Sequence, residues 1–196
     1  MSNIKEAIRQ INGSLPSESN GSKVILFKTL AKTNSEQTVI ANLALMYARA
    51  GEKVLILDTD FSSKVFNQAF GLKSQLGLSD YLSGGSSNVA NIIQAVSGEN
   101  ISIVCSGTLP LEDTAYLLGD PKMMNFIEKI NNKYDRILIS TAVFESKSND
   151  EYLLKYADGV VIVQDLKAIK KMQMLSMLDM LDKSNVKVLG YISAKK

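Results

Sequence analysis

The sequence predicts an α/β fold in which helices cover both faces of a doubly wound, mostly parallel β-sheet. Short apolar runs, such as residues 54–57 and 159–163, are continuous rather than alternating, as in parallel strands buried on both faces. Helical patterns separate these runs, and strands that alternate with helices indicate parallel pairing. With 196 residues, the chain is long enough to form one such domain with a complete core.

The predicted elements run from a short helix to a final strand. Apolar residues at helical spacing predict a helix over 3–12, and the turn-rich segment 13–22 leads into the domain. We therefore expect residues 1–22 to be an N-terminal helix and linker, and residues 23–196 to be a single α/β domain. Strands are expected at residues 24–28, 54–57, 101–104, 136–140, 159–163 and 186–192.

Two longer helices are predicted between these strands. The helix over 36–50 is expected to end at Gly51 and to bury Val39, Leu43, Met46 and Ala50.

The helix over 168–183 carries two apolar rows. The row expected to face the sheet is Met172, Leu175, Leu178 and Leu181. The second row is Met174, Met177 and Met180. Methionine-rich surfaces suit adaptable protein contacts, so Met174 and Met177 are candidate interface residues. The alternative is a helix that is buried more deeply than average.

Composition excludes several classes of function. A net charge of +2 with scattered lysines gives no electrostatic case for nucleic-acid binding. The chain has no histidine and a single cysteine, Cys105, which we expect to be a buried, inert thiol. An intrachain disulfide is therefore impossible, and no zinc site is expected. Without a signal peptide or an apolar run of membrane length, we expect a cytoplasmic protein that reaches a membrane only through a partner.

The most informative segment is residues 23–60, which read as strand, loop, long helix and strand. This frame normally holds a nucleoside triphosphate on a loop of sequence G-x-x-x-x-G-K-[ST]. Here the glycine positions hold Thr33 and Ser35, the lysine position holds Glu36, and the Mg²⁺-binding hydroxyl is replaced by Gln37. The degenerate phosphate loop comprises Thr33, Asn34, Ser35, Glu36, Gln37 and Thr38. The scaffold of a P-loop ATPase without its phosphate chemistry indicates a pseudoenzyme.

Two physical arguments support this interpretation. A lysine–phosphate contact is worth about 1.5–3 kcal/mol, and a carboxylate in its place adds repulsion, so affinity should fall by roughly two to four decades. Thr33 and Glu36 also match the capping box T-x-x-E, in which they would satisfy free N–H groups at the start of the helix.

Several segments together resemble one family. They are LILDTD at 55–60, GLSDYLSGG at 77–85, SGTLPLEDTAYLLGDPKM at 106–123, YDRILIST at 134–141, and the two last predicted strands. In order and spacing they resemble the cytoplasmic domain of bacterial tyrosine kinases, P-loop proteins of the deviant Walker group that regulate capsular and extracellular polysaccharide synthesis. The likeness extends from about Glu6 to the end of the chain.

The resemblance assigns roles to positions that have mostly changed. Asp58 and Asp60 match the family's metal-associated and catalytic carboxylates, and are either vestigial or structural here. The second metal-binding aspartate is replaced by Ser140, the adenine-binding asparagine by Ala194, and the basic residues after D-x-D by Phe61 and Ser62. We therefore expect no catalytic residue, no bound metal, and neither ATP nor Mg²⁺ as cofactor.

The resemblance also implies assembly. Glu6, Ile8 and Arg9 lie in a segment similar to the family's E-x-x-R-x-x-R helix, which joins subunits into a ring; the second arginine is Asn12 here. An ordinary amphipathic helix is the alternative. The implied partners are the cytoplasmic tail of a membrane chain-length regulator (a polysaccharide co-polymerase), an active kinase paralogue, or further copies of the chain.

Three functions follow from these observations. The first is a catalytically inactive, regulatory or structural partner in capsular or extracellular polysaccharide synthesis. The second is a divergent but active ATP-dependent tyrosine kinase or ATPase. The third is a positioning ATPase of the ParA/MinD group, which needs a signature lysine where this chain has Ala31, with Lys32 one residue away.

Overall fold

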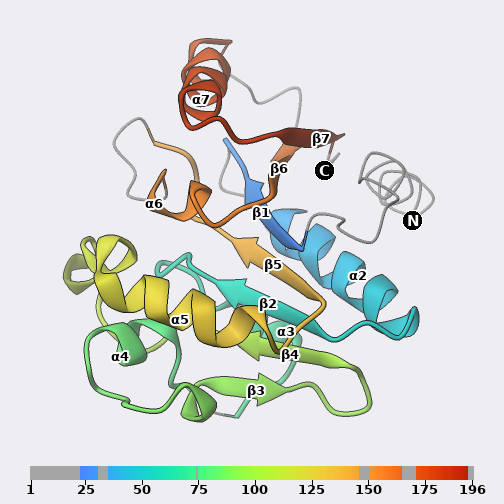
Figure 1. The fold of residues 1–196 in the computed structure, drawn as a ribbon, viewed down its shortest axis with the longest axis vertical. Helices are drawn as coiled ribbons and strands as arrows, with labels where there is room; N and C mark the ends of the chain where they lie inside the picture. The colour runs from blue at the N-terminus through green and yellow to red at the C-terminus, as the bar shows by residue number, and fades with distance from the viewer. Residues whose placement is uncertain (1–22, 31–34, 74, 146–150, 165–170, 194–196) are drawn as a thin grey trace.

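The predicted sheet forms the centre of the molecule. The computed structural model describes residues 23–30, 35–73, 75–145, 151–164 and 171–193. Seven strands lie in the order β3-β4-β2-β5-β1-β6-β7, and all pairs are parallel except β3 with β4 (Figure 1). The strands are β1 (Val24–Lys28), β2 (Val54–Asp58), β3 (Ile93–Ala95), β4 (Ile101–Val104), β5 (Arg136–Ser140), β6 (Gly159–Gln164) and β7 (Val188–Ser193).

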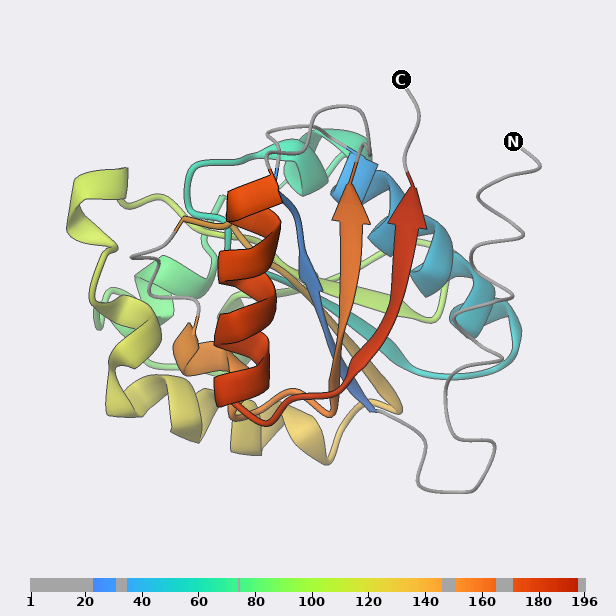
Figure 2. The ribbon, with the colours of Figure 1, turned by 90° about the horizontal axis from the view of Figure 1, so that it is seen from above.

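Helices cover both faces of this sheet. They are α2 (Ser35–Arg49), α3 (Val65–Ala69), α4 (Leu78–Leu82), α5 (Pro121–Asn131), α6 (Glu151–Leu154) and α7 (Lys171–Lys183), with short 3₁₀ turns at Val89–Asn91, Leu111–Asp113 and Leu117–Gly119. Alternate strand residues enter two cores, so Val24 and Leu26 pack on one side while Ile25 and Phe27 pack on the other. Figure 2 shows the sheet between α2 and the layer that contains α5 and α7.

The end of α2 follows the prediction. The Gly51 N–H donates to the Ala48 carbonyl and the Glu52 N–H donates to the Tyr47 carbonyl, while Gly51 has a φ of 94°. This is the Schellman arrangement, which favours glycine. The predicted buried face of α2 is wrong in part, because Met46 is half-buried, Ala50 is exposed, and the core instead takes additional residues: Ile40, Ala44 and Tyr47.

The predicted orientation of α7 is wrong in part, because Leu178 and Leu181 face the sheet as expected but Met172 and Leu175 do not. Met177 is fully buried, whereas Met172 is 72% exposed and Leu175 is 49% exposed. Met174, Met177, Leu178 and Leu181 follow the i, i+3, i+4, i+7 spacing, and this wider stripe faces the sheet. Met174 and Met177 therefore contribute to the core and are not a free interface.

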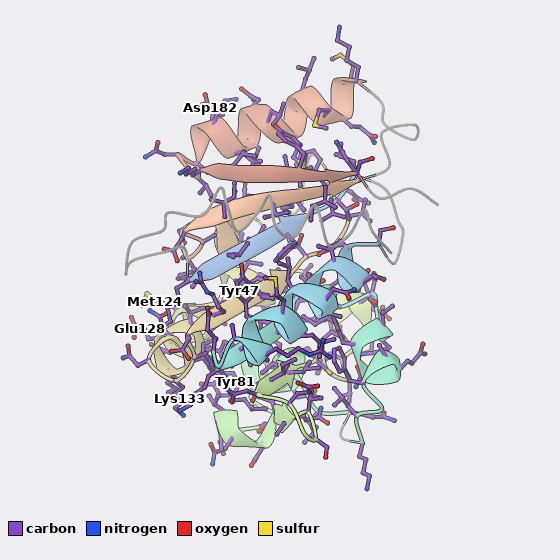
Figure 3. The ribbon with its side chains drawn as sticks, turned by 90° about the vertical axis from the view of Figure 1, so that its right-hand side faces the viewer. Tyr47, Tyr81, Met124, Glu128, Lys133 and Asp182 are labelled. Atoms are coloured by element: carbon purple, nitrogen blue, oxygen red, sulfur yellow. The ribbon has the colours of Figure 1, made fainter. Side chains whose placement is uncertain are left out.

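Helix α5 shows the expected division between a buried and an exposed face. Its buried side chains are Met123, Phe126, Ile127 and Ile130. Met124 and Glu128 lie along its outer side, and Lys133 is exposed just past its end, as labelled in Figure 3. Pro121 stands at its start and Asp120 caps it, with the Asp120 side chain accepting a hydrogen bond from the Lys122 N–H at 2.8 Å.

Candidate functional site

The candidate site lies where the parallel strands end and α2 begins. Asp58 ends β2 and Ser140 ends β5, and these two residues are paired in the sheet register. Both extend the face that packs against α2, because their alternate neighbours Ile56 and Leu138 belong to the core on that side. The structure thus brings together the first turn of α2, the D-x-D segment and the end of β5, as the predicted topology requires.

Glu36 joins α2 to β5. Its carboxylate is 1% exposed, and Oε1 accepts hydrogen bonds from Ser140 Oγ at 3.1 Å and from the Thr141 N–H at 3.2 Å. Burial raises the pKa of Glu36 well above its ordinary value, and the nearby charges of Asp58 and Asp60 raise it further. The Glu36 carboxyl group is therefore an internal link between two elements, through a bond between residues 104 positions apart.

Thr33 and Asn34 lie outside the described residues, so the capping box of Thr33 and Glu36 stays a prediction. Ser35 is half-buried in the first turn of α2, and Thr38 is exposed on the outer side of that helix.

Asp58 and Asp60 are held by the turn that follows β2. Asp58 is 1% exposed; its Oδ1 accepts from the Asp60 N–H at 3.1 Å, and its Oδ2 has no hydrogen-bond partner. Burial raises the pKa of Asp58 well above its ordinary value, and the charge of Asp60 adds to this effect. Asp60 Oδ1 accepts from the N–H of Ser62 at 3.0 Å and from its Oγ at 2.6 Å.

Lys64 belongs to the site although the sequence analysis did not select it. Its ammonium group donates to the carbonyl of Gly107 and, at 3.4 Å, to Ser106 Oγ, and its charge acts to lower the pKa of Asp58. The available signal was a basic residue four positions after Asp60. The family's basic residues are expected directly after D-x-D, where this chain has Phe61 and Ser62.

Several of these residues line a cavity of about 250 Å³. It is lined from α2 by Glu36 and Gln37, from the segment after β2 by Asp60 and Lys64, from α3 by Gln68, and from the end of β5 by Thr141. Within the described part of the chain, no group of three or more acidic or cysteine side chains is placed to hold a metal ion.

Several predicted site residues are not among those that the structure describes. Ala194 at the expected adenine site, and Glu6, Ile8 and Arg9 of the expected interface, lie outside the described residues. Cys105 is fully buried at the end of β4, and burial raises its pKa to about 12, as expected for an inert thiol. None of the described helices is long and apolar enough to span a bilayer.

Known proteins show both sequence and structural similarity. No protein-family model matches the sequence. The tyrosine-protein kinase CpsD of Streptococcus agalactiae is 29% identical over 174 residues, which are 88% of this chain and 75% of the relative.

Two solved structures extend the similarity to the fold. The chimerical protein CapA2B2 superimposes with a TM-score of 0.83 at 23% identity, covering 97% of this chain and 82% of that protein. The septum site-determining protein MinD of Pyrococcus horikoshii, solved with Mg-ADP, has a TM-score of 0.70 at 21% identity over 86% of this chain and 68% of its own. The predicted doubly wound fold of the MinD type is therefore confirmed.

Proposed function

We propose that this relative of the bacterial tyrosine kinases is a catalytically inactive, regulatory or structural partner in capsular or extracellular polysaccharide synthesis. The observation that carries the proposal is the position of the Glu36 carboxylate. It lies buried in the first turn of α2, where a P-loop protein presents N–H groups and a lysine to phosphate, and it is hydrogen-bonded to Ser140 and Thr141.

The charges around this cavity argue against phosphate binding. Glu36, Asp58 and Asp60 are three carboxyl groups, and Lys64 is the cationic residue that lines the described cavity. A nucleotide triphosphate would bring further negative charge into buried surroundings, where like charges repel strongly. A carboxylate at the lysine position costs roughly two to four decades of affinity by the arithmetic of the lost contact and the added repulsion.

The proposed partners follow from the relatives. The family resemblance implies a membrane co-polymerase as partner, and the chimerical protein CapA2B2 is similar to this chain over 97% of its length. We propose the cytoplasmic tail of such a co-polymerase, or an active kinase paralogue, as partner. Self-assembly through the segment of Glu6, Ile8 and Arg9 belongs to the same proposal, whereas the α7 residues Met174 and Met177 no longer do.

One observation favours a second candidate, an active kinase that binds nucleotide through unfamiliar contacts. Asp58 and Asp60 are retained at the carboxyl edge of β2, and Lys64 supplies a cation beside them. If Glu36 took up a proton, its repulsion of phosphate would be removed. This candidate and the first one make opposite predictions for nucleotide binding.

Isothermal titration with ATP and ADP, each with and without Mg²⁺, decides between them. We expect the wild-type chain not to bind nucleotide at millimolar concentration. When it is mixed with ATP and the tyrosine-bearing tail of an active paralogue, we expect no phosphotyrosine to form on that tail. The matched variant Glu36→Lys, Gln37→Thr, Ser140→Asp restores the three family residues and should gain affinity if the loop retains its shape. A micromolar dissociation constant for the wild type would overturn the proposal.

A further inference from the structure

A residue that lines the cavity beside Glu36 has a buried hydrogen-bond acceptor without a donor. Gln37 is 8% exposed and lines the cavity, yet its Oε1 accepts no hydrogen bond. Asp58 Oδ2, which is electrostatically coupled to Glu36 and Asp60, is likewise unpartnered. A buried acceptor without a donor costs about 1–3 kcal/mol, and most buried polar atoms in proteins are satisfied. Asp58 does not line the cavity, whereas Gln37 does, and the unpartnered Gln37 oxygen thus indicates that a donor is missing there.

The charges around the cavity favour a cation as that donor. Glu36 and Asp60 line it from two different elements, and Asp58 lies close enough to raise the pKa of Glu36. Lys64 directs its ammonium group at Gly107 and Ser106, on the side of the loop after β4. Among the described residues that line the cavity, the one ammonium group is thus already engaged elsewhere, and a second cation would find both hydrogen-bond acceptors and opposite charge.

The geometry favours an organic cation over a metal ion. The described acidic side chains do not converge on one point as metal ligands do, and their oxygens come from separate elements around a cavity of about 250 Å³. A guanidinium group is planar and carries five N–H donors in a fixed fork, so it bridges acceptors that are spaced apart. An ammonium group is compact and would reach fewer of them at once.

We propose that this cavity, which in P-loop proteins holds phosphate, receives a guanidinium group in this chain, from an arginine side chain of a partner protein or from a free guanidinium compound. The inference rests on the proposed absence of nucleotide, because the two ligands would share the same space. Gln37, Asp60 and Glu36 would accept its hydrogen bonds, with Asp58 contributing charge from behind them.

The probe is N-acetyl-arginine amide, and its neutral isostere N-acetyl-citrulline amide is the matched ligand control. We expect the arginine amide to raise the melting temperature and to shift backbone amide resonances of α2 and of residues 58–68, and the citrulline amide to do neither. N-acetyl-lysine amide should bind more weakly. Equal effects of all three compounds, or none at tens of millimolar, would overturn the proposal.

Two variants test the residues. Gln37→Leu removes the unpartnered Oε1 and should leave the melting temperature unchanged or higher. It should weaken binding of the arginine amide about tenfold, through the loss of one charge-assisted hydrogen bond. Asp60→Asn should weaken it similarly, and Glu128→Gln, which removes an exposed carboxylate on the distant outer side of α5, should not. Equal weakening in Glu128→Gln would indicate non-specific attraction and would overturn the assignment.

Further experiments distinguish a partner protein's arginine from a free guanidinium compound, and separate the guanidinium site from the proposed lack of nucleotide binding. Stronger binding of a blocked Gly-Arg-Gly peptide than of free arginine supports a protein source, and the reverse supports a small molecule. Nucleotide binding is titrated on the same samples. ATP binding by the wild type refutes the proposed function, whereas absence of both ATP and arginine-amide binding refutes only the guanidinium site.

Discussion

Replacing Glu36 by glutamine should make the protein more stable at neutral and alkaline pH, although it alters a side chain that bridges two elements. The glutamine side chain would keep an oxygen in the position of Oε1, where it can accept from Ser140 Oγ and from the Thr141 N–H. What the substitution removes is an ionisable group in a buried site. The expected gain therefore comes from charge rather than from packing.

The magnitude follows from proton linkage. Burial raises the pKa of Glu36 in the folded protein well above 4.5, its ordinary value, which it regains on unfolding. Between these two pKa values the folded protein holds a proton that the unfolded chain releases, so the free energy of unfolding falls as pH rises. Each unit of separation costs about 1.4 kcal/mol, and the loss is complete once the pH exceeds the folded pKa. Below 4.5 the effect vanishes.

The assay is chemical denaturation of wild type, Glu36→Gln and Glu36→Ala from pH 5 to pH 8. Wild-type stability should decline across this range, and the decline should be smaller in the glutamine variant, with the remainder due to Asp58, whose pKa is also raised. The alanine variant leaves the Ser140 hydroxyl and the Thr141 N–H without their acceptor, which costs about 1–3 kcal/mol each at every pH. The reasoning would be refuted if the glutamine variant had a lower free energy of unfolding than the wild type at pH 8 and the same dependence of that free energy on pH.

Two further predictions concern the fold. Met177→Ala should cost about 2–5 kcal/mol because it empties a buried site, whereas Met172→Ala on the exposed side of α7 should change the free energy of unfolding by less than about 0.5 kcal/mol; similar values for both would mean that α7 is wrongly oriented. Gly107→Ala should destabilise by more than Gly98→Ala, since both glycines have positive φ but a Cβ at Gly107 would clash with Ser79 Oγ whereas one at Gly98 meets nothing within 4 Å. Equal melting temperatures would show that the loop at Gly107 can rearrange.

The sequence was sufficient for the parts of the fold that depend on local pattern. Short, largely apolar segments located six strands. Gly51 marked the end of α2, because its left-handed conformation closes the Schellman bonds. The seventh strand, Ile93–Ala95, has three half-buried or exposed residues, so it lacked both the length and the apolar pattern that identify a strand.

The sequence was insufficient for the buried side of α7, where two apolar rows compete, and for contacts between residues far apart in the chain. Helix α7 carries apolar residues on more than one side, and only packing against the sheet decides which side is buried. The sequence showed that Glu36 and Ser140 were both unusual, and the topology brought them to one edge. It could not show that they bond to each other, since that depends on side-chain direction.

The bond between Glu36 and Ser140 also bears on how readily nucleotide chemistry could return to this scaffold. Ser140→Asp alone would set a further carboxylate against Glu36 in a buried site that already holds Asp58, and one of the group would have to stay protonated. Glu36→Lys alone would remove the acceptor on which Ser140 and Thr141 depend. Each single substitution is expected to give a less stable protein, so folding stability ties the residue at position 36 to the residue at position 140, whatever the activity of the chain.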